Sequence, residues 1–155
     1  MDIGNFMKTL LIIGSIYKLN NNRMEQKDKE LLLKDLCARL PYKVKAQIPD
    51  EYGGYTSAIE SIDIDGFVVD FEGTQIEIEY IKPYLFPLSS MTERQCYKLA
   101  SIRSEFQDCW KYVKTPIPLS ICNFEQIDWF HKNHLDYRGL IPKGLAIDAT
   151  GLNIY

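Results

Sequence analysis

Hydrophobic residues at helical spacing follow the first 23 residues, and an alternation of apolar and polar residues comes after them. Between Glu25 and Leu40 the apolar positions share one stripe, which predicts an amphipathic helix that ends at Pro41. The expected buried positions are Leu32, Leu33, Leu36, Cys37 and Leu40, and those expected to face water are Lys29, Glu30, Lys34 and Asp35.

The alternation predicts four strands, over residues 42–48, 57–65, 67–71 and 76–80, each with one buried face. Glycines and acidic residues mark the short loops between them, so an antiparallel meander is expected. The positions expected to face inward are Ile62, Ile64, Phe67, Val69, Phe71, Ile76, Ile78 and Tyr80. Such a sheet needs cover on its apolar face. It therefore either curls into a small SH3-like barrel or is covered by helices.

The second half of the chain predicts two helices and a final hairpin. Residues 82–87 contain two prolines and are expected to form an extended connector. Ser90 to Glu93 has the spacing of a capping box and opens a helix to about Val113, while Asn123 caps a shorter one that carries Phe124 and Phe130. Residues 144–155 form a hairpin around Thr150 and Gly151. The predicted fold class is therefore α+β, with the meander flanked by an N-terminal helix and two C-terminal helices.

The 155 residues suffice for one domain, which we place at 24–155. Residues 1–23 form an N-terminal extension to it, and the sequence leaves open whether they are native or whether Met24 is the natural first residue. The apolar run within residues 7–17 faintly imitates a secretory signal, but it has no small-x-small cleavage site and is too short to cross a bilayer. No membrane association is expected.

Cysteine usage favours a reducing compartment. The four cysteines are spread along the chain without a CxxC pair, which argues against a zinc ribbon or a redox motif. We expect Cys37, Cys96 and Cys109 to be buried thiols of a cytoplasmic protein.

Charge is distributed unevenly along the chain. The net charge is -3, and residues 46–81 contain nine acidic residues and no lysine or arginine. Strand alternation is expected to place the acidic residues of this stretch on one outer face of the sheet: Asp63, Asp65, Asp70, Glu77 and Glu79. Such a face repels nucleic acid and attracts basic proteins. The alternative is that these carboxylates only keep an exposed sheet soluble.

Two tyrosines flank a glycine pair in the loop before the second predicted strand. Tyr52 and Tyr55 either form a binding loop or fold down onto the end of the sheet. Gly53 and Gly54 match no phosphate-binding loop, and no cofactor is expected.

Asp128, His131 and His134 form the one metal-like constellation in the sequence. Their three-residue spacing would let them converge on a helix, and imidazole with carboxylate suits zinc or iron(II). The alternative is that a histidine packs at the edge of the core and Asp128 pairs with Lys132.

Three segments carry a resemblance to known sequences. They are KDKELLLKDLCARLPY (27–42), IKPYLFPLSSMT (81–92) and IDWF (127–130) followed by DYRGLIPKGLA (136–146). The chain resembles small uncharacterised proteins of phages and prophages of gut Bacteroidales over residues 24–148. Those proteins begin near the equivalent of Met24 and often have glycine where this chain has Lys43. The resemblance implies a phage or mobile-element protein that acts in the bacterial cytoplasm, and it implies no catalytic residues.

The sequence thus favours a non-enzymatic accessory protein that binds a host or phage macromolecule through its acidic sheet face. Two alternatives remain at this point: a protein that binds a signalling nucleotide in an aromatic-lined pocket, and a metal-dependent hydrolase centred on the two histidines.

Overall fold

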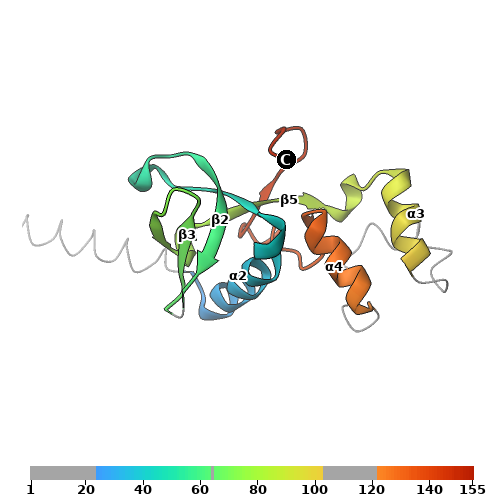
Figure 1. Cartoon of the computed structure of the whole chain (residues 1–155), viewed down its shortest axis with the longest axis horizontal. Helices are drawn as coiled ribbons and strands as arrows, with labels where there is room; N and C mark the ends of the chain where they lie inside the picture. Colours follow the sequence, from blue (N-terminus) through green and yellow to red (C-terminus); the bar gives the residue numbers. More distant parts are fainter. Residues whose placement is uncertain (1–23, 64, 103–121) are drawn as a thin grey trace, which may run out of the picture.

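The computed structural model describes residues 24–63, 65–102 and 122–155, and this part of the chain has an α+β fold with three α-helices and a mixed sheet of seven strands (Figure 1). The helices are α2 (Gln26–Arg39), α3 (Glu93–Ile102) and α4 (Phe124–Lys132). The strands are β1 (Lys45–Gln47), β2 (Thr56–Ile62), β3 (Phe67–Asp70), β4 (Gln75–Glu77), β5 (Lys82–Pro87), β6 (Leu135–Asp136) and β7 (Ile147–Asp148). The predicted extension of the α3 helix to Val113, Cys109 and the inward position of Ile64 lie outside the described residues.

The predicted meander is confirmed, because β1 to β4 pair in chain order and antiparallel. The predicted barrel is wrong, because the sheet is open and runs in the order β4-β3-β2-β1-β5-β6, with β7 also paired to β5. The free edge of β1 is taken by β5, so the sheet continues outward from the meander instead of closing on β4.

The expected connector at residues 82–87 is the strand β5, which has neighbours from three parts of the chain. It pairs antiparallel with β1 and parallel with β6 and β7. Its prolines, Pro83 and Pro87, lie near the two ends of the strand. Between them the Phe86 amide donates to the carbonyl of His134, and the Leu85 carbonyl accepts from the Ala149 amide, both at 2.8 Å. A proline removes only its own N–H, so the residues between the two prolines can still form ladder bonds.

The expected C-terminal hairpin is also wrong, although its turn is present. Leu152 donates to the carbonyl of Ala149 at 3.1 Å, and Gly151 has a φ of 75° in this turn. The strand before the turn, β7, pairs in parallel with β5 and not with the residues that follow it.

Helix α2 forms as predicted, but its buried face is rotated from the expected one. Leu32 and Leu36 are fully buried among Val44, Ile48 and other residues of the sheet. Asp35, which we expected to face water, is also fully buried, and Cys37, which we expected to be buried, is exposed. The reason is that Asp35 pairs with Arg39 one turn later, and this pair faces helix α4.

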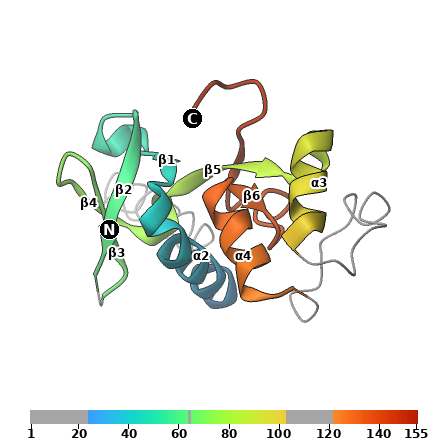
Figure 2. The same ribbon diagram turned by 45° about the vertical axis from the view of Figure 1, so that its right-hand side comes forward.

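A second hydrophobic cluster joins α3 and α4 to the end of β5 (Figure 2), and its buried residues are Leu88, Leu99, Phe130, Leu135 and Tyr137. The predicted Asn123 cap of α4 is confirmed, because its side chain accepts from the Gln126 amide. Helix α3 is capped two residues later than expected, by Thr92 with Gln95. Phe124, expected on the apolar stripe, is 91% exposed.

Strand β3 faces the opposite way from the prediction. Val68 and Asp70 are buried, and Phe71 is 74% exposed. Val68 lies opposite the buried Ile76 of β4, so the pairing fixes which side of β3 enters the core. Alternation itself holds from Phe67 to Asp70, and only its phase is opposite to the prediction. The inward positions of Ile76 and Ile78 are confirmed, while Tyr80 is 48% exposed.

Among the described helices, none combines the length and the apolar character needed to cross a bilayer.

Candidate functional site: an acidic surface with two exposed tyrosines

The nine acidic residues of the lysine- and arginine-free stretch lie mostly at the surface. Glu79 is half-buried, Asp70 is buried, and the remaining seven are exposed: Asp50, Glu51, Glu60, Asp63, Asp65, Glu72 and Glu77. The meander therefore presents a strongly anionic surface. The prediction that Asp70 belongs to that surface is wrong, because this residue is only 1% exposed.

Asp70 is held inside by the turn that follows β3 and by a tyrosine of the neighbouring loop. Its Oδ1 accepts from the amides of Glu72 at 3.0 Å and Thr74 at 2.9 Å, and its Oδ2 accepts from the Tyr55 hydroxyl at 2.5 Å. The Asp70 carboxylate raises the pKa of Tyr55 by accepting this hydrogen bond. Tyr55 thus folds down onto the sheet, which was one of the two roles left open by the sequence, and Asp70 and Tyr55 stabilise the fold.

Asp63 shapes the turn between β2 and β3. Its Oδ1 accepts from the amides of Asp65 and Phe67, each at 2.9 Å. A carboxylate that bonds to the backbone two and four residues later fixes a tight turn. Asp63 and Asp65 remain exposed and contribute charge, but Asp63 has a clear structural role as well.

Tyr52 and Tyr80 come together with three carboxylates. Tyr52 ends the 3-10 turn Asp50–Tyr52, and Tyr80 ends the 3-10 turn Ile78–Tyr80, which leads from β4 to β5. Their exposed fractions are 36% and 48%. We define the acidic tyrosine patch as Glu51, Tyr52, Glu77, Glu79 and Tyr80.

The other members of the acidic tyrosine patch all act on the hydroxyl of Tyr80 through their charge. The pKa of the Tyr80 hydroxyl is raised, chiefly by the Glu79 carboxylate, next by partial burial and Glu77, and then by Tyr52 and Glu51. The three carboxylates oppose a further negative charge, so the patch favours a cation. In addition, the Glu79 Oε2 atom is shielded from water and has no hydrogen-bond partner among the described residues.

Tyr80 was missed as a surface residue because strict alternation placed it beside Ile76 and Ile78. The structure ends β4 at Glu77, and the 3-10 turn after it rotates the tyrosine to the surface. The lack of basic residues through this segment was the signal that pointed to a distinctive surface.

The structure does not bring Asp128, His131 and His134 together. Asp128 accepts a hydrogen bond from the Tyr42 hydroxyl, and His131 Nε2 lies 2.7 Å from the Tyr137 hydroxyl. His134 lies beyond the end of α4 and stacks on Tyr155. Over residues 24–63, 65–102 and 122–155, no group of three or more histidine, cysteine, aspartate or glutamate side chains is placed to hold a metal ion.

Both histidines are buried and uncharged near neutral pH. Burial, aided by the Arg39 charge, lowers the pKa of His131 to about 4. Burial, aided by Arg39 and Lys45, lowers the pKa of His134 to about 4 as well. The alternative of histidines that pack in the core therefore describes both residues.

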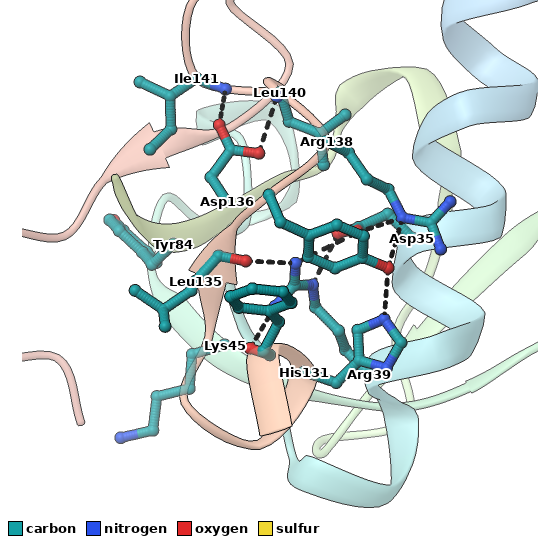
Figure 3. Close-up of polar contacts among 12 residues, drawn as sticks. Asp35, Arg39, Lys45, Tyr84, His131, Leu135, Asp136, Arg138, Leu140 and Ile141 are labelled. Carbon is teal, nitrogen blue, oxygen red and sulfur yellow. Dashed lines mark hydrogen bonds and ion pairs between the residues drawn. The ribbon is translucent and has the colours of Figure 1, made fainter. Parts of the chain in front are cut away.

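A buried polar network connects α2 to the segment after α4 (Figure 3). Asp35 binds Arg39 through two contacts of 2.7 and 3.1 Å and Arg138 through one of 3.2 Å. Arg39 also donates to the carbonyl of Leu135 at 2.8 Å. All of these contacts join residues of this chain to one another, and the guanidinium groups of Arg39 and Arg138 share the Asp35 carboxylate. The network is therefore a structural connection between α2 and β6.

No family model, curated protein or solved structure matches the chain. The geometry and charge of the acidic tyrosine patch are therefore the features that bear on function.

Proposed function

We propose that the protein is a non-enzymatic accessory protein of a phage or mobile element, which binds a basic segment of a host or phage protein in the bacterial cytoplasm. The observation that carries the proposal is the acidic tyrosine patch, where two exposed aromatic rings lie among three carboxylates and the surrounding stretch has no basic residue.

The chemistry of the patch favours lysine or arginine in the partner. Tyrosine rings attract cations over their faces, and a guanidinium group stacks on them while donating to carboxylates. The Oε2 atom of Glu79 is shielded from water and lacks a partner among the described residues, so the Glu79 carboxylate contributes to the negative potential of the patch. The exposed carboxylates of Glu51 and Glu77 would add longer-range attraction, which speeds encounter with a basic partner at low salt.

The charge argues against nucleic acid as the partner of this surface. Phosphate backbones need clustered lysine and arginine, and residues 46–81 contain none. A basic protein segment is therefore the class of partner that the surface fits.

The proposal is tested by neutralising the carboxylates of the patch without changing shape. The variant Glu51→Gln, Glu77→Gln, Glu79→Gln is compared with a matched control of equal charge change on exposed residues elsewhere, Glu30→Gln, Glu93→Gln, Glu125→Gln. Binding to an immobilised arginine-rich peptide is measured at low and at physiological salt. We expect the patch variant to bind at least tenfold more weakly and the control to bind within about twofold of the parent protein.

Equal loss in both variants would mean that only net charge matters, and it would overturn the assignment to this patch. Asp63 and Asp70 are left unchanged in the design, because their carboxylates hold turns together. Affinity capture from host lysate with the parent protein and both variants would then identify the natural partner.

A further inference from the structure

Tyr155 occupies a site formed by strands β1 and β5 and by His134. All of these lie far from Tyr155 in the sequence. Its ring stacks on the His134 imidazole, with centroids 3.8 Å apart and planes 10° apart. The Phe86 ring lies at 5.9 Å, and the Lys45 ammonium lies 5.8 Å from the Tyr155 ring centroid. Figure 2 shows this last segment of the chain curving back over β1 and β5.

The hydroxyl of Tyr155 is bound at the point where β1 and β5 stop pairing. It accepts from the Lys45 amide at 3.1 Å and donates to the Tyr84 carbonyl at 2.8 Å. The ladder between the two strands ends with the pair Ala46 and Pro83. The next residues, Lys45 and Tyr84, are therefore not paired with each other in this ladder. Donor and acceptor together recognise a hydroxyl group, which phenylalanine would not supply. We call the site formed by Lys45, Tyr84, Phe86 and His134 the tyrosine socket.

His134 is built into the socket at a cost to the fold. Its φ of 52° lies in the left-handed region, and its side chain is more than nine-tenths buried while Nδ1 has no hydrogen-bond partner in the described residues. Backbone strain and an unsatisfied buried nitrogen both reduce stability. A residue that only fills space in the core would not be expected to have both. The Tyr155 hydroxyl does not satisfy this nitrogen, because it bonds to the backbone of Lys45 and Tyr84.

Apart from the stacked ring of Tyr155 and the two hydrogen bonds of its hydroxyl, few contacts hold this segment in place. Leu152 is 49% exposed, Asn153 has a positive φ of 51°, and Lys45 Nζ donates to the carbonyl of Ile154 at 2.7 Å. Tyr155 itself remains 42% exposed although its hydroxyl is enclosed. Segments with little buried surface and few backbone hydrogen bonds open at low free-energy cost.

We propose that the tyrosine socket is a second binding site, which recognises a tyrosine side chain of a partner peptide and which Tyr155 covers as an exchangeable internal ligand. The bound segment itself shows the chemistry that fits: an aromatic ring against His134 and a hydroxyl between Lys45 N–H and the Tyr84 carbonyl. The site lies on other residues than the acidic tyrosine patch, and the two proposals are independent of each other.

The test uses the full chain, N-acetyl-tyrosinamide as the probe, and the imidazole NMR signals of His134 as the readout. In Tyr155→Ala the socket is vacated, and we expect the probe to bind at least ten times more tightly than to the parent protein. N-acetyl-phenylalaninamide, which lacks the hydroxyl, should bind at least ten times more weakly than the tyrosine probe. Tyr52→Ala is the matched control, because it removes another exposed tyrosine, and its affinity for the probe should equal that of the parent.

A second variant keeps the test decisive if Tyr155→Ala does not fold. Tyr155→Phe retains the stacked ring and loses only the two hydrogen bonds of the hydroxyl. The probe should therefore displace the phenylalanine ring at position 155 of this variant at a concentration about tenfold lower than the concentration that displaces Tyr155 of the parent protein.

The proposal is overturned if the probe affects parent and variants at the same concentration or affects none of them. It is also overturned if adenosine binds the vacated socket more tightly than the tyrosine probe. Dimerisation of the parent protein through this site, seen by sedimentation and lost in Tyr155→Ala, would replace the separate partner by a second copy of this chain.

Discussion

The carboxylate of Asp35 binds the guanidinium of Arg39 at two points, with neither side chain exposed to water. Removing one charge of a buried pair leaves the other charge buried without its partner. The resulting loss of stability is larger than the net contribution of the intact pair. We therefore expect Asp35→Asn to lower the free energy of unfolding by about 3 to 5 kcal/mol. Urea denaturation followed by circular dichroism measures this change.

The matched control for this ion pair is the exposed contact between Asp28 and Lys143, at 3.2 Å. Lys143→Met should change the free energy of unfolding by less than about 1 kcal/mol, because surface pairs contribute little. A loss of similar size in Asp35→Asn and Lys143→Met would contradict the structural role of the buried network.

Acid should destabilise the protein through its two buried histidines. The pKa of each is lowered to about 4 in the folded state, so each stays neutral there while it gains a proton in the unfolded chain below about pH 6.5. Their contribution is complete above pH 6.5 and is lost progressively as the pH falls toward 4, on the order of 3 kcal/mol for each. Unfolding in urea at several pH values between about 7.5 and 4.5 measures this loss.

His134→Asn separates the contributions of the two histidines, since asparagine tolerates the positive φ at this position. The variant should lose roughly half of the pH dependence between about 6.5 and 4.5. An unchanged pH dependence would show that His134 is not the neutral buried group described above.

Lys43 is expected to reduce stability at the end of the first helical segment. It has a φ of 53° directly after the 3-10 turn Leu40–Tyr42, in the left-handed region that glycine adopts without strain. Lys43→Gly should raise the free energy of unfolding by about 0.5 to 1 kcal/mol. Lys34→Gly, at an exposed position within α2, should instead lower it by about 1 kcal/mol. Stabilisation by both changes, or by neither, would contradict the backbone argument.

Tyr55 and Asp70 should behave as parts of the fold and not as parts of the binding surface. Tyr55→Phe removes the hydrogen bond to Asp70 Oδ2 and should lower the free energy of unfolding by about 1 to 3 kcal/mol. Its affinity for an arginine-rich peptide should stay within about twofold of the parent protein. A larger loss of affinity in a folded variant would return Tyr55 to the candidate site.

Local sequence patterns predicted the meander, helix α2 and the Asn123 cap, because each depends on residues close together in the chain. They failed where distant segments decide the outcome. The strand β5 is created by pairing with β1, β6 and β7, and the inward side of β3 is selected by Val68 meeting Ile76 across the ladder. Asp35 was assigned to the surface because its spacing from Arg39 is equally typical of an exposed helical pair.

The candidate site was predictable in charge and not in geometry. The absence of lysine and arginine from residues 46–81 identified the anionic surface with Glu77 and Glu79, and the loop around Gly53 and Gly54 identified Tyr52. The sequence did not identify Tyr80 as their exposed neighbour, because a 3-10 turn breaks the alternation after Glu77. Nor could it identify the tyrosine socket, because Tyr84 and Lys45 lie 71 and 110 positions from Tyr155 in the sequence.

The place of β5 between β1 and the two short parallel strands has a consequence for synthesis of the chain. A nascent polypeptide that has left the ribosome as far as residue 87 can form the meander and add β5 to it, but the far side of β5 then waits for residues 135 and 147. During that interval the strand offers unpaired amides and carbonyls to any extended peptide nearby. Completion of the sheet is thus timed by translation, and slow translation of the second half would favour aggregation over folding.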